Sequence, residues 1–371
     1  MSADARVVVI GGGVIGCAAA LALARRGARV TLLERDAIAA GASQAAAGML
    51  APLSESDAPG CLATAGVEAL AMHKRSAQAL EEIAGMSIAA TLAGTFMLAR
   101  DEKQAEALRQ RLEWQRELDG SIALLGGDEL RQAVPELGKG FLTGLHYPAE
   151  LQVDSRSYTI ALARAAAAAG AEVVQGTPVI ALRRSGERVI AVETPEAVIN
   201  TDRVLVATGH DASLLHTLGV ALPLQPVKGD LLRLLPPQVV TRSIIFAPGG
   251  YLTPKADGTL LVGATQQPGR HDHTVEASSV AQLLKFAFSV RPSLRQARFV
   301  AVQSGLRPSL PDRLPAIGPI PGLEGLFVAV GHYRNGILLA GWTAERLALA
   351  MLGGEDCIPA EFLPARMLAG I

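Results

Sequence analysis

The chain has 371 residues, of which half are hydrophobic and 19% are charged. That length predicts about two domains, and the apolar content is enough to bury a large core. Lys and Arg total 34 against 35 Asp and Glu, so no excess of positive charge is left to neutralise phosphates. The composition therefore excludes a disordered chain and argues against a protein that binds DNA or RNA.

Cysteine usage and hydropathy predict where the protein resides. Cys17, Cys61 and Cys357 are odd in number and widely spaced, which fits neither a disulfide framework nor a metal site. A reducing cytoplasm is expected. Residues 7–24 carry no charge and reach the length of a membrane span, but glycines interrupt the apolar run. We therefore predict a soluble, unprocessed protein without a transmembrane segment.

The N-terminal residues predict a strand at 6–10, a glycine-rich turn at 11–16 that leads into an alanine- and leucine-rich helix up to Arg26, and a second strand at 29–33. The turn after the first strand has the G-x-G-x-x-G spacing, which allows a tight turn and close approach of backbone to a pyrophosphate. Glu34 follows about twenty residues later, where a carboxylate accepts hydrogen bonds from ribose hydroxyls and repels a 2′-phosphate. This predicts an FAD or NAD site rather than an NADP site; the alternative is a glycine-rich turn without a ligand. The motif glycines are Gly11, Gly13 and Gly16.

Residues 41–52 are mostly small, so a flat ring system could lie against their main chain. The alternative is an alanine-rich helix, because alanine has the highest helix propensity.

An alternating α/β pattern returns in the middle of the chain. Ser155 is predicted to cap a helix that ends before Gly170. One buried strand ends at Thr208-Gly209, the position at which ligands bind in doubly wound sheets. The predicted helices here are residues 67–83, 104–118 and 155–169, and the strands are 95–98, 144–147, 172–175, 179–182 and 204–207.

The last third predicts an antiparallel sheet followed by a second strand-glycine-helix unit. Asp257-Gly258 is a hairpin turn signal between two short strands. No second G-x-G-x-x-G occurs in mid-chain, so the layout of a reductase that binds both FAD and NAD is missing. The predicted strands are 230–235, 250–253, 259–262 and 326–330, and the helices are 275–290 and 337–352.

Several motifs together resemble the flavin-dependent D-amino-acid oxidase superfamily, and within it the glycine oxidases of thiamine biosynthesis. The resemblance spans nearly the whole chain, and its most specific parts are Gly305-Leu306-Arg307-Pro308 and residues 332–339. Its other parts are the N-terminal glycines with Glu34, residues 45–50, Thr177-Pro178-Val179, Pro226-Val227-Lys228-Gly229 and Gly263-Ala264-Thr265.

The resemblance implies an α/β fold: a doubly wound, Rossmann-like FAD domain and a second domain with an antiparallel or mixed sheet. It places the FAD domain at residues 1–87, 145–225 and 306–371, and the substrate domain at 88–144 and 226–305. The resemblance implies that FAD binds noncovalently. The contacts expected from it are Val14, Ile15, Glu34, Arg35, Ala42, Ser43, Ala47, Gly48, Met49, Val179, His332, Tyr333, Arg334, Asn335, Gly336, Ile337 and Leu338, to which the glycine motif and the strand end add Gly11, Gly13, Gly16 and Gly209.

The resemblance also implies that Arg307 binds the substrate carboxylate, with help from Tyr251 and Arg334. A planar guanidinium pairs with a carboxylate through two hydrogen bonds and so orients it. Gln266 is expected on the sheet, facing the substrate amine. Each arginine alone is also compatible with a surface ion pair, and Tyr251 with a core aromatic. No acid–base side chain is assigned, because the flavin supplies the chemistry.

Three positions depart from the family pattern: Gln266 stands where an apolar residue is usual, Asp230 replaces Glu or Gln, and Gly341-Trp342-Thr343-Ala344 replaces Pro-Ala-Thr-Gly. They leave the exact substrate open. His271-Asp272-His273 resembles a metal-binding motif, but no further metal-binding residues accompany it in the sequence. We therefore predict a solvated loop and no metal.

The resemblance implies oxidative deamination of glycine, sarcosine or small D-amino acids to an α-keto acid, ammonia or amine, and hydrogen peroxide, with oxygen as the electron acceptor. The product would be glycine imine or glyoxylate for the thiazole of thiamine, and a homo-oligomer is implied as well. One alternative is a dehydrogenase for amines or N-methyl amino acids that passes electrons to a quinone. Another is a noncatalytic FAD-binding module.

Overall fold

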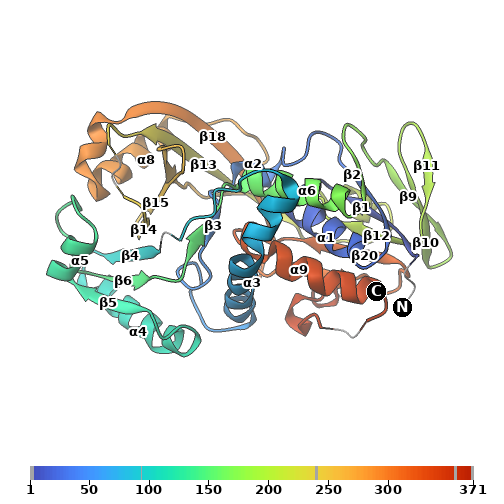
Figure 1. The fold of residues 1–371 in the computed structure, drawn as a ribbon, viewed down its shortest axis with the longest axis horizontal. Coiled ribbons are helices and arrows are strands. Elements are labelled where there is room, and N and C mark those ends of the chain that lie inside the picture. The colour runs from blue at the N-terminus through green and yellow to red at the C-terminus, as the bar shows by residue number, and fades with distance from the viewer. Residues whose placement is uncertain (1–3, 93, 239–240, 355–356, 369–371) are drawn as a thin grey trace.

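The computed structural model describes residues 4–92, 94–238, 241–354 and 357–368. Two large sheets lie at opposite ends of an elongated molecule, and helix α3 (Cys61–Ala84) stands between them (Figure 1). The N-terminal strand belongs to the six-stranded sheet, and the strands within residues 225–309 belong to the nine-stranded one.

The six-stranded sheet has the strand order β19-β20-β12-β1-β2-β8 and is parallel except for β19. Parallel strands buried on both faces need continuous apolar runs, and β1, β12 and β20 supply them. Because parallel strands share their direction, their carboxyl ends meet along one edge. The strands are β1 (Arg6–Ile10), β2 (Arg29–Leu33), β8 (Glu172–Val174), β12 (Arg203–Val206), β19 (Ala316–Pro319) and β20 (Leu326–Val330).

The two faces of this sheet are covered differently. Val7 and Val9 pack against helices α1 (Val14–Ala24), α6 (Ser155–Ala168) and α9 (Gly336–Met351), the last two of which lie on either side of α1. Val8 and Ile10 point to the other face, which meets a small antiparallel sheet (Figure 1). That sheet consists of β9 (Ala181–Ser185), β10 (Arg188–Glu193) and β11 (Val198–Asn200).

The nine-stranded sheet is antiparallel except for one parallel pair, β4 with β14. Helix α8 (Ala277–Val290) and α5 (Gly127–Ala133) pack on one face and α4 (Glu102–Leu118) on the other, as the alternation of Phe96 and Met97 along β4 shows. The strands are β17 (Gln267–Pro268), β13 (Gln225–Leu235), β16 (Leu260–Gly263), β15 (Gly250–Pro254), β14 (Ile244–Ala247), β4 (Thr95–Ala99), β6 (Thr143–Tyr147) and β5 (Ala123–Gly126), with β18 (Arg298–Ser309) paired to β13.

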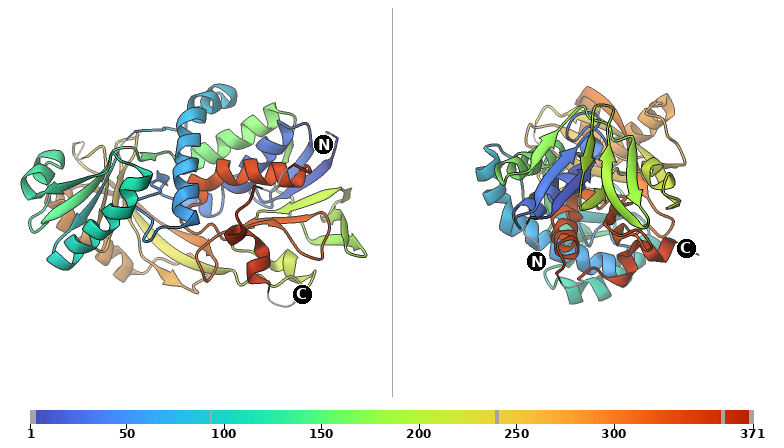
Figure 2. Two further views of the ribbon diagram at one scale, coloured as in Figure 1. Left: turned by 90° about the horizontal axis from the view of Figure 1, so that it is seen from below. Right: turned by 90° about the vertical axis from the view of Figure 1, so that its right-hand side faces the viewer.

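Short elements connect the two halves (Figure 2). Helix α2 (Ala42–Ala45) lies against β18, and β3 (Met49–Leu50) pairs with β7 (Leu151–Gln152). Lys255, at the end of β15, donates hydrogen bonds to the carbonyl oxygens of Ala47 and Val153, which belong to this connection. The remaining short elements are α7 (Ser213–His216), η1 (Pro292–Gln296), η2 (Ala360–Phe362) and η3 (Pro364–Met367).

The predicted fold class is confirmed, and most predicted elements occur within about three residues of their predicted bounds. Two begin earlier than predicted: α3 begins at Cys61 instead of residue 67, and β13 begins at Gln225 instead of residue 230. Ser155 is not the N-cap of α6: Asp154 is, and its side chain accepts the Ser157 N–H at 2.8 Å. The strand expected at 179–182 begins only at Ala181, although the Ile180 N–H already donates to the Glu193 carbonyl oxygen at 2.8 Å. The long strand β18 was not predicted, because five successive exposed residues at its start hide the period of two.

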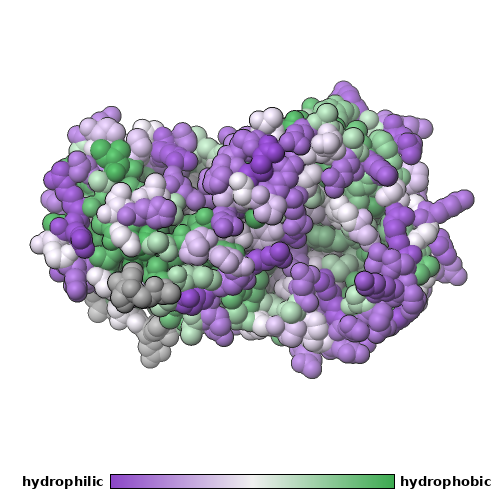
Figure 3. Space-filling view, turned by 180° about the vertical axis from the view of Figure 1, so that it is seen from behind, coloured by the Kyte–Doolittle hydropathy of each residue, from purple (hydrophilic) through white to green (hydrophobic). Residues whose placement is uncertain are grey.

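No helix among the described residues is both long and apolar enough to cross a membrane. On the face seen in Figure 3, hydrophilic side chains are interspersed with apolar ones.

Candidate active site

The first cavity lies at the carboxyl edge of the six-stranded sheet and measures about 340 Å³. Its floor is the turn from β1 to α1, where Gly11 has φ +111°. A Cβ on Gly11 would lie 2.5 Å from the Ala207 oxygen, and one on Gly16 would lie 1.9 Å from the Gly11 oxygen. Only glycine permits this packing, which leaves the N-terminus of α1 open toward the cavity.

Glu34 ends β2 at the rim of this cavity, as the spacing predicts. Its carboxylate accepts the N–H of Gly12, inside the glycine motif, and the N–H of Asp36 at 2.8 Å. These bonds hold the carboxylate beside the turn. A ribose on the adenosine side of a dinucleotide would meet it there.

The loop between β20 and α9 closes the other side of the cavity. His332 is buried, and burial lowers its pKa to about 3, so the ring is neutral at physiological pH. Its Nε2 lies 3.2 Å from the Thr343 hydroxyl. The departure at Gly341-Trp342-Thr343-Ala344 thus lies in the packing of α9, where Trp342 donates to Glu68 at 2.8 Å, and not on a cavity wall.

A second cavity of about 510 Å³ continues from the first toward the nine-stranded sheet. Ala42, Ala46 and Ile337 line both cavities. Gly48, with φ +77°, brings backbone close: a Cβ there would lie 2.0 Å from the Val153 oxygen. The segment around it is extended apart from the four residues of α2, so the alternative of an alanine-rich helix applies only there.

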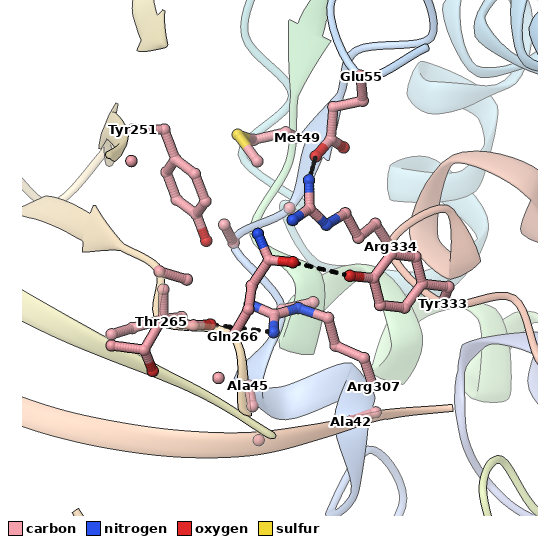
Figure 4. Close-up of a pocket in the computed structure, with 18 of the residues that line it drawn as sticks. Ala42, Ala45, Met49, Glu55, Tyr251, Thr265, Gln266, Arg307, Tyr333 and Arg334 are labelled. Carbon is pink, nitrogen blue, oxygen red and sulfur yellow. Dashed lines mark hydrogen bonds and ion pairs between the residues drawn. The ribbon is translucent and has the colours of Figure 1, made fainter. Parts of the chain in front are cut away.

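Arg307 points into the second cavity from β18 (Figure 4). Its guanidinium lies over Gly229 of the neighbouring strand β13, and Nη1 lies 3.4 Å from the Thr265 carbonyl oxygen. Within the described residues no ion pair joins Arg307 to a carboxylate. A partly buried guanidinium without a counterion is a candidate anion site.

Tyr251 lines the same cavity and is not a plain core aromatic. Its hydroxyl group points toward Arg307 and Gln266 (Figure 4). Burial raises its pKa to about 12, against the opposing charge of Arg307, so the phenol is neutral and can donate a hydrogen bond.

Gln266 lies in the loop between β16 and β17, so its predicted place on the sheet was wrong. It does face the cavity, where its side-chain oxygen accepts a hydrogen bond from the Tyr333 hydroxyl at 3.3 Å. Asp230 points to the opposite face of β13 from Gly229, which lines the cavity, and lies 3.9 Å from Lys228. Of the two single-residue departures, only Gln266 touches the cavity.

Arg334 reaches the second cavity from the loop after β20 and is paired with a residue that sequence reasoning missed. Its Nη1 lies 3.9 Å from Oε1 of Glu55, whose side chain is 8% exposed. Burial raises the pKa of Glu55 to about 7, although Arg334 and Arg307 both oppose the rise. The sequence offered one signal for Glu55: its carboxylate follows the small-residue segment 41–52 by three residues.

The structure brings most predicted cofactor residues to the two cavities. Three do not line either one: Gly16 packs inside the turn, Asn335 is the N-cap residue of α9, and Leu338 is buried where α9 packs against Gly66 of α3. The residues that line the cavities as predicted are Gly11, Gly13, Val14, Ile15, Glu34, Arg35, Ala42, Ser43, Ala47, Gly48, Met49, Val179, Gly209, His332, Tyr333, Arg334, Gly336 and Ile337.

The pair of cavities fits FAD, since a glycine turn with an acid at the adenosine end leads without interruption to a chamber walled by small residues and backbone. The family model "DAO: FAD dependent oxidoreductase" matches residues 6–350. The chain belongs to this family. It is therefore an FAD-dependent oxidoreductase, and FAD is its cofactor.

Curated relatives and solved structures agree with this assignment. Glycine oxidase of Geobacillus kaustophilus is 36% identical over 92% of this chain and 91% of that protein. Glycine oxidase of Pseudomonas aeruginosa is 34% identical over 98% and 99%. The crystal structure of the Geobacillus enzyme superposes with a TM-score of 0.93 at 34% identity, covering 99% of this chain and 100% of that one.

The motif His271-Asp272-His273 is engaged in other contacts. Asp272 pairs with Arg270 at 2.7 Å and lies 3.4 Å from Lys228, and His273 lies 3.3 Å from the Ser304 oxygen. Across the described ranges, no group of three or more metal-binding side chains comes together.

Proposed function

We propose that this enzyme oxidises the α-carbon of a small amino acid: glycine, sarcosine or a small D-amino acid. The observation that carries the proposal is the uncompensated guanidinium of Arg307 over Gly229, in a chamber that continues from the dinucleotide cavity. A carboxylate of the substrate would complete this cation. Many of the residues that line the chamber are glycine or alanine, which leaves room for the flavin ring beside the substrate.

The chain's own contribution is binding and orientation. Arg307 would hold the carboxylate through two hydrogen bonds, and the Tyr251 hydroxyl would donate a third. Gln266 and Tyr333 would close the chamber on the amine side through their hydrogen bond. No titrating acid or base is required of these residues, because the substrate amine would bind in its neutral form.

The chemistry that FAD would supply when bound is two-electron oxidation, by which a hydride leaves the α-carbon and oxygen is reduced to hydrogen peroxide. The amino acid would leave as an imine, which water hydrolyses to an α-keto acid and ammonia or amine. In sum, amino acid, oxygen and water give keto acid, ammonia and hydrogen peroxide.

Relatives support both the reaction and its place in metabolism. Besides the glycine oxidases, a protein named bifunctional ThiO/ThiG from Nostoc is 32% identical over 92% of this chain and 52% of its own length. About half of that protein therefore lies outside the similarity. We extend the proposal to a supply of glycine imine or glyoxylate for thiamine thiazole.

The decisive experiment is anaerobic reduction of the holoenzyme by glycine, sarcosine and D-alanine, followed through loss of flavin absorbance. Reduction by at least one of them supports the proposal. If no small amine reduces the flavin, the alternative of a noncatalytic FAD-binding protein is favoured. Hydrogen peroxide formed per turnover then decides between oxygen and a quinone as electron acceptor.

Three assignments belong to the proposal as well. The FAD domain would comprise residues 1–87, 145–225 and 306–371, and the substrate domain 88–144 and 226–305. The enzyme would act in the cytoplasm as a homo-oligomer, which sedimentation of the purified protein tests.

A further inference from the structure

The substrate chamber holds two arginines from different elements and one carboxylate. Arg307 comes from β18, and Arg334 comes from the loop that precedes α9. Glu55 pairs with Arg334, at 3.9 Å, while Arg307 has no such partner among the described residues (Figure 4). The chamber therefore carries one guanidinium more than it has carboxylates.

The unpaired guanidinium of Arg307 can form an ion pair with one substrate carboxylate. The guanidinium of Arg334 could pair with a second carboxylate if Glu55 were absent. With Glu55 ionised, a second carboxylate would have to displace or approach a like charge in a partly buried site, which is unfavourable.

The position of Glu55 is fixed by a buried residue behind it. Glu150 accepts hydrogen bonds from the N–H groups of Leu53 and Ser54, at 3.1 and 2.9 Å, and from the Ser54 hydroxyl at 2.7 Å. Gln115 donates to the Leu53 carbonyl oxygen at 2.6 Å. The backbone just before Glu55 is thus held at several points, which fixes the place from which its side chain reaches Arg334.

We infer that Glu55 is a specificity-determining residue, which neutralises Arg334 and thereby restricts the chamber to amino acids with a single carboxylate. The inference rests on the proposed function and names its substrate class: monocarboxylic amines are accepted and dicarboxylic ones are disfavoured.

The charged and titratable groups that face Glu55 are Arg334, Arg307, Tyr251 and Asp57. Burial raises the pKa of Glu55 to about 7, so its charge is lost on mild acidification. Discrimination against a second carboxylate should therefore weaken as the pH falls through neutrality.

The test uses acetate and malonate as probes that bind without being oxidised. The holoenzyme is titrated with each, the flavin absorbance is followed, and the ratio of the two dissociation constants is compared between wild type and Glu55→Gln. The substitution keeps shape and removes charge, so malonate should gain at least tenfold relative to acetate. In the double variant Glu55→Gln and Arg334→Gln, the increase in malonate affinity relative to acetate should disappear, because no second guanidinium is left.

Asp57→Asn is the matched control. Asp57 lies on the same loop, is 86% exposed and pairs with Arg111 outside the chamber. Its charge only adds to the rise in the pKa of Glu55, so its removal keeps Glu55 ionised and should leave the ratio at pH 8.5 within about twofold. A ratio in Glu55→Gln within twofold of wild type, or an equal change in Asp57→Asn, would overturn the inference.

Wild-type enzyme provides a second measurement in case Glu55→Gln does not fold. Between pH 8.5 and 6.5 the affinity for malonate relative to acetate should rise several-fold, and a flat ratio contradicts the inference. Reduction by glycine is measured separately. If glycine reduces the flavin but the ratio does not respond, the inference fails alone; if the ratio responds but no amine reduces the flavin, the proposed function fails.

Discussion

Arg307 lies over Gly229 so closely that a Cβ on Gly229 would come within 2.2 Å of the guanidinium. The two residues belong to adjacent antiparallel strands, in which Val227 is the direct partner of Arg307. The bare backbone of Gly229 is therefore the floor on which the guanidinium rests. The position of the Arg307 guanidinium, the proposed binding group for the substrate carboxylate, therefore depends on the lack of a side chain at Gly229.

Gly229→Ala should displace Arg307 without unfolding the protein, because the added methyl meets the end of a flexible side chain. We expect anaerobic flavin reduction by glycine to slow by about tenfold to a hundredfold, the cost of a displacement near 1 Å at an active site. Stopped-flow absorbance measures the rate. Gly120→Ala is the control, since a Cβ there meets no atom within 4 Å and should change nothing.

Arg307→Lys keeps the charge but loses the planar fork that orients a carboxylate. Both the affinity for acetate and the anaerobic reduction rate should fall, the rate by on the order of a hundredfold, and Arg307→Ala should be worse. Wild-type rates with glycine, sarcosine and D-alanine alike would show that the clamp is assigned to the wrong arginine. Arg334 would then be the candidate.

Glu34→Ala should weaken FAD binding by about 1 to 3 kcal/mol, the range for hydrogen bonds to a charged group. The loss includes the support that Glu34 gives to the N–H groups of Gly12 and Asp36. Glu34→Gln separates the contributions, because an amide can accept the Gly12 bond but carries no charge. Fluorescence titration of the apoprotein measures the affinity, and an unchanged value in both variants removes Glu34 from the ribose.

Local patterns predicted the cofactor half well. The glycine turn, Glu34 and the strand before α9 can each be recognised from a few consecutive residues. The first cavity could therefore be inferred without knowledge of tertiary contacts. The N-cap of α6 was predicted one residue late because Asp154 and Ser155 are both good caps, and only the geometry chooses between them.

The substrate half depends on contacts between distant segments. Strand β18 is defined by its pairing with β13, about 70 residues earlier, and not by its own alternation. Glu55 reaches the chamber because Glu150, 96 residues away from Ser54, holds the loop before it. Sequence spacing alone does not encode either relationship.

The purified protein should be yellow and should release unmodified FAD on denaturation. Cys17 is buried beneath the glycine turn, where its thiol lies 3.4 Å from the Gly12 oxygen, and neither Cys61 nor Cys357 lines a cavity. No cysteine is therefore placed to attach the flavin. Precipitation with acid, followed by chromatography of the supernatant, measures the released cofactor; flavin retained in the pellet would contradict the prediction.

Glu55 should make stability depend on pH. Its pKa is raised from an ordinary value of 4.5 to about 7 on folding, so the folded state binds more protons than the unfolded state between these values. The contribution of this group to stability is therefore lost as the pH rises from about 5 to above 7.

The Glu55→Gln variant has no ionisable group at this position, so its stability does not fall in this way as the pH rises. Its free energy of unfolding relative to wild type should rise by about 1 to 3 kcal/mol between pH 5 and pH 8, at 1.36 kcal/mol per unit of pKa shift. Urea titrations of both holoproteins at the two pH values measure the difference, with Asp57→Asn as a control that removes an exposed charge from the same loop. A difference that stays constant with pH would mean that Glu55 ionises as freely in the folded protein as in the unfolded chain.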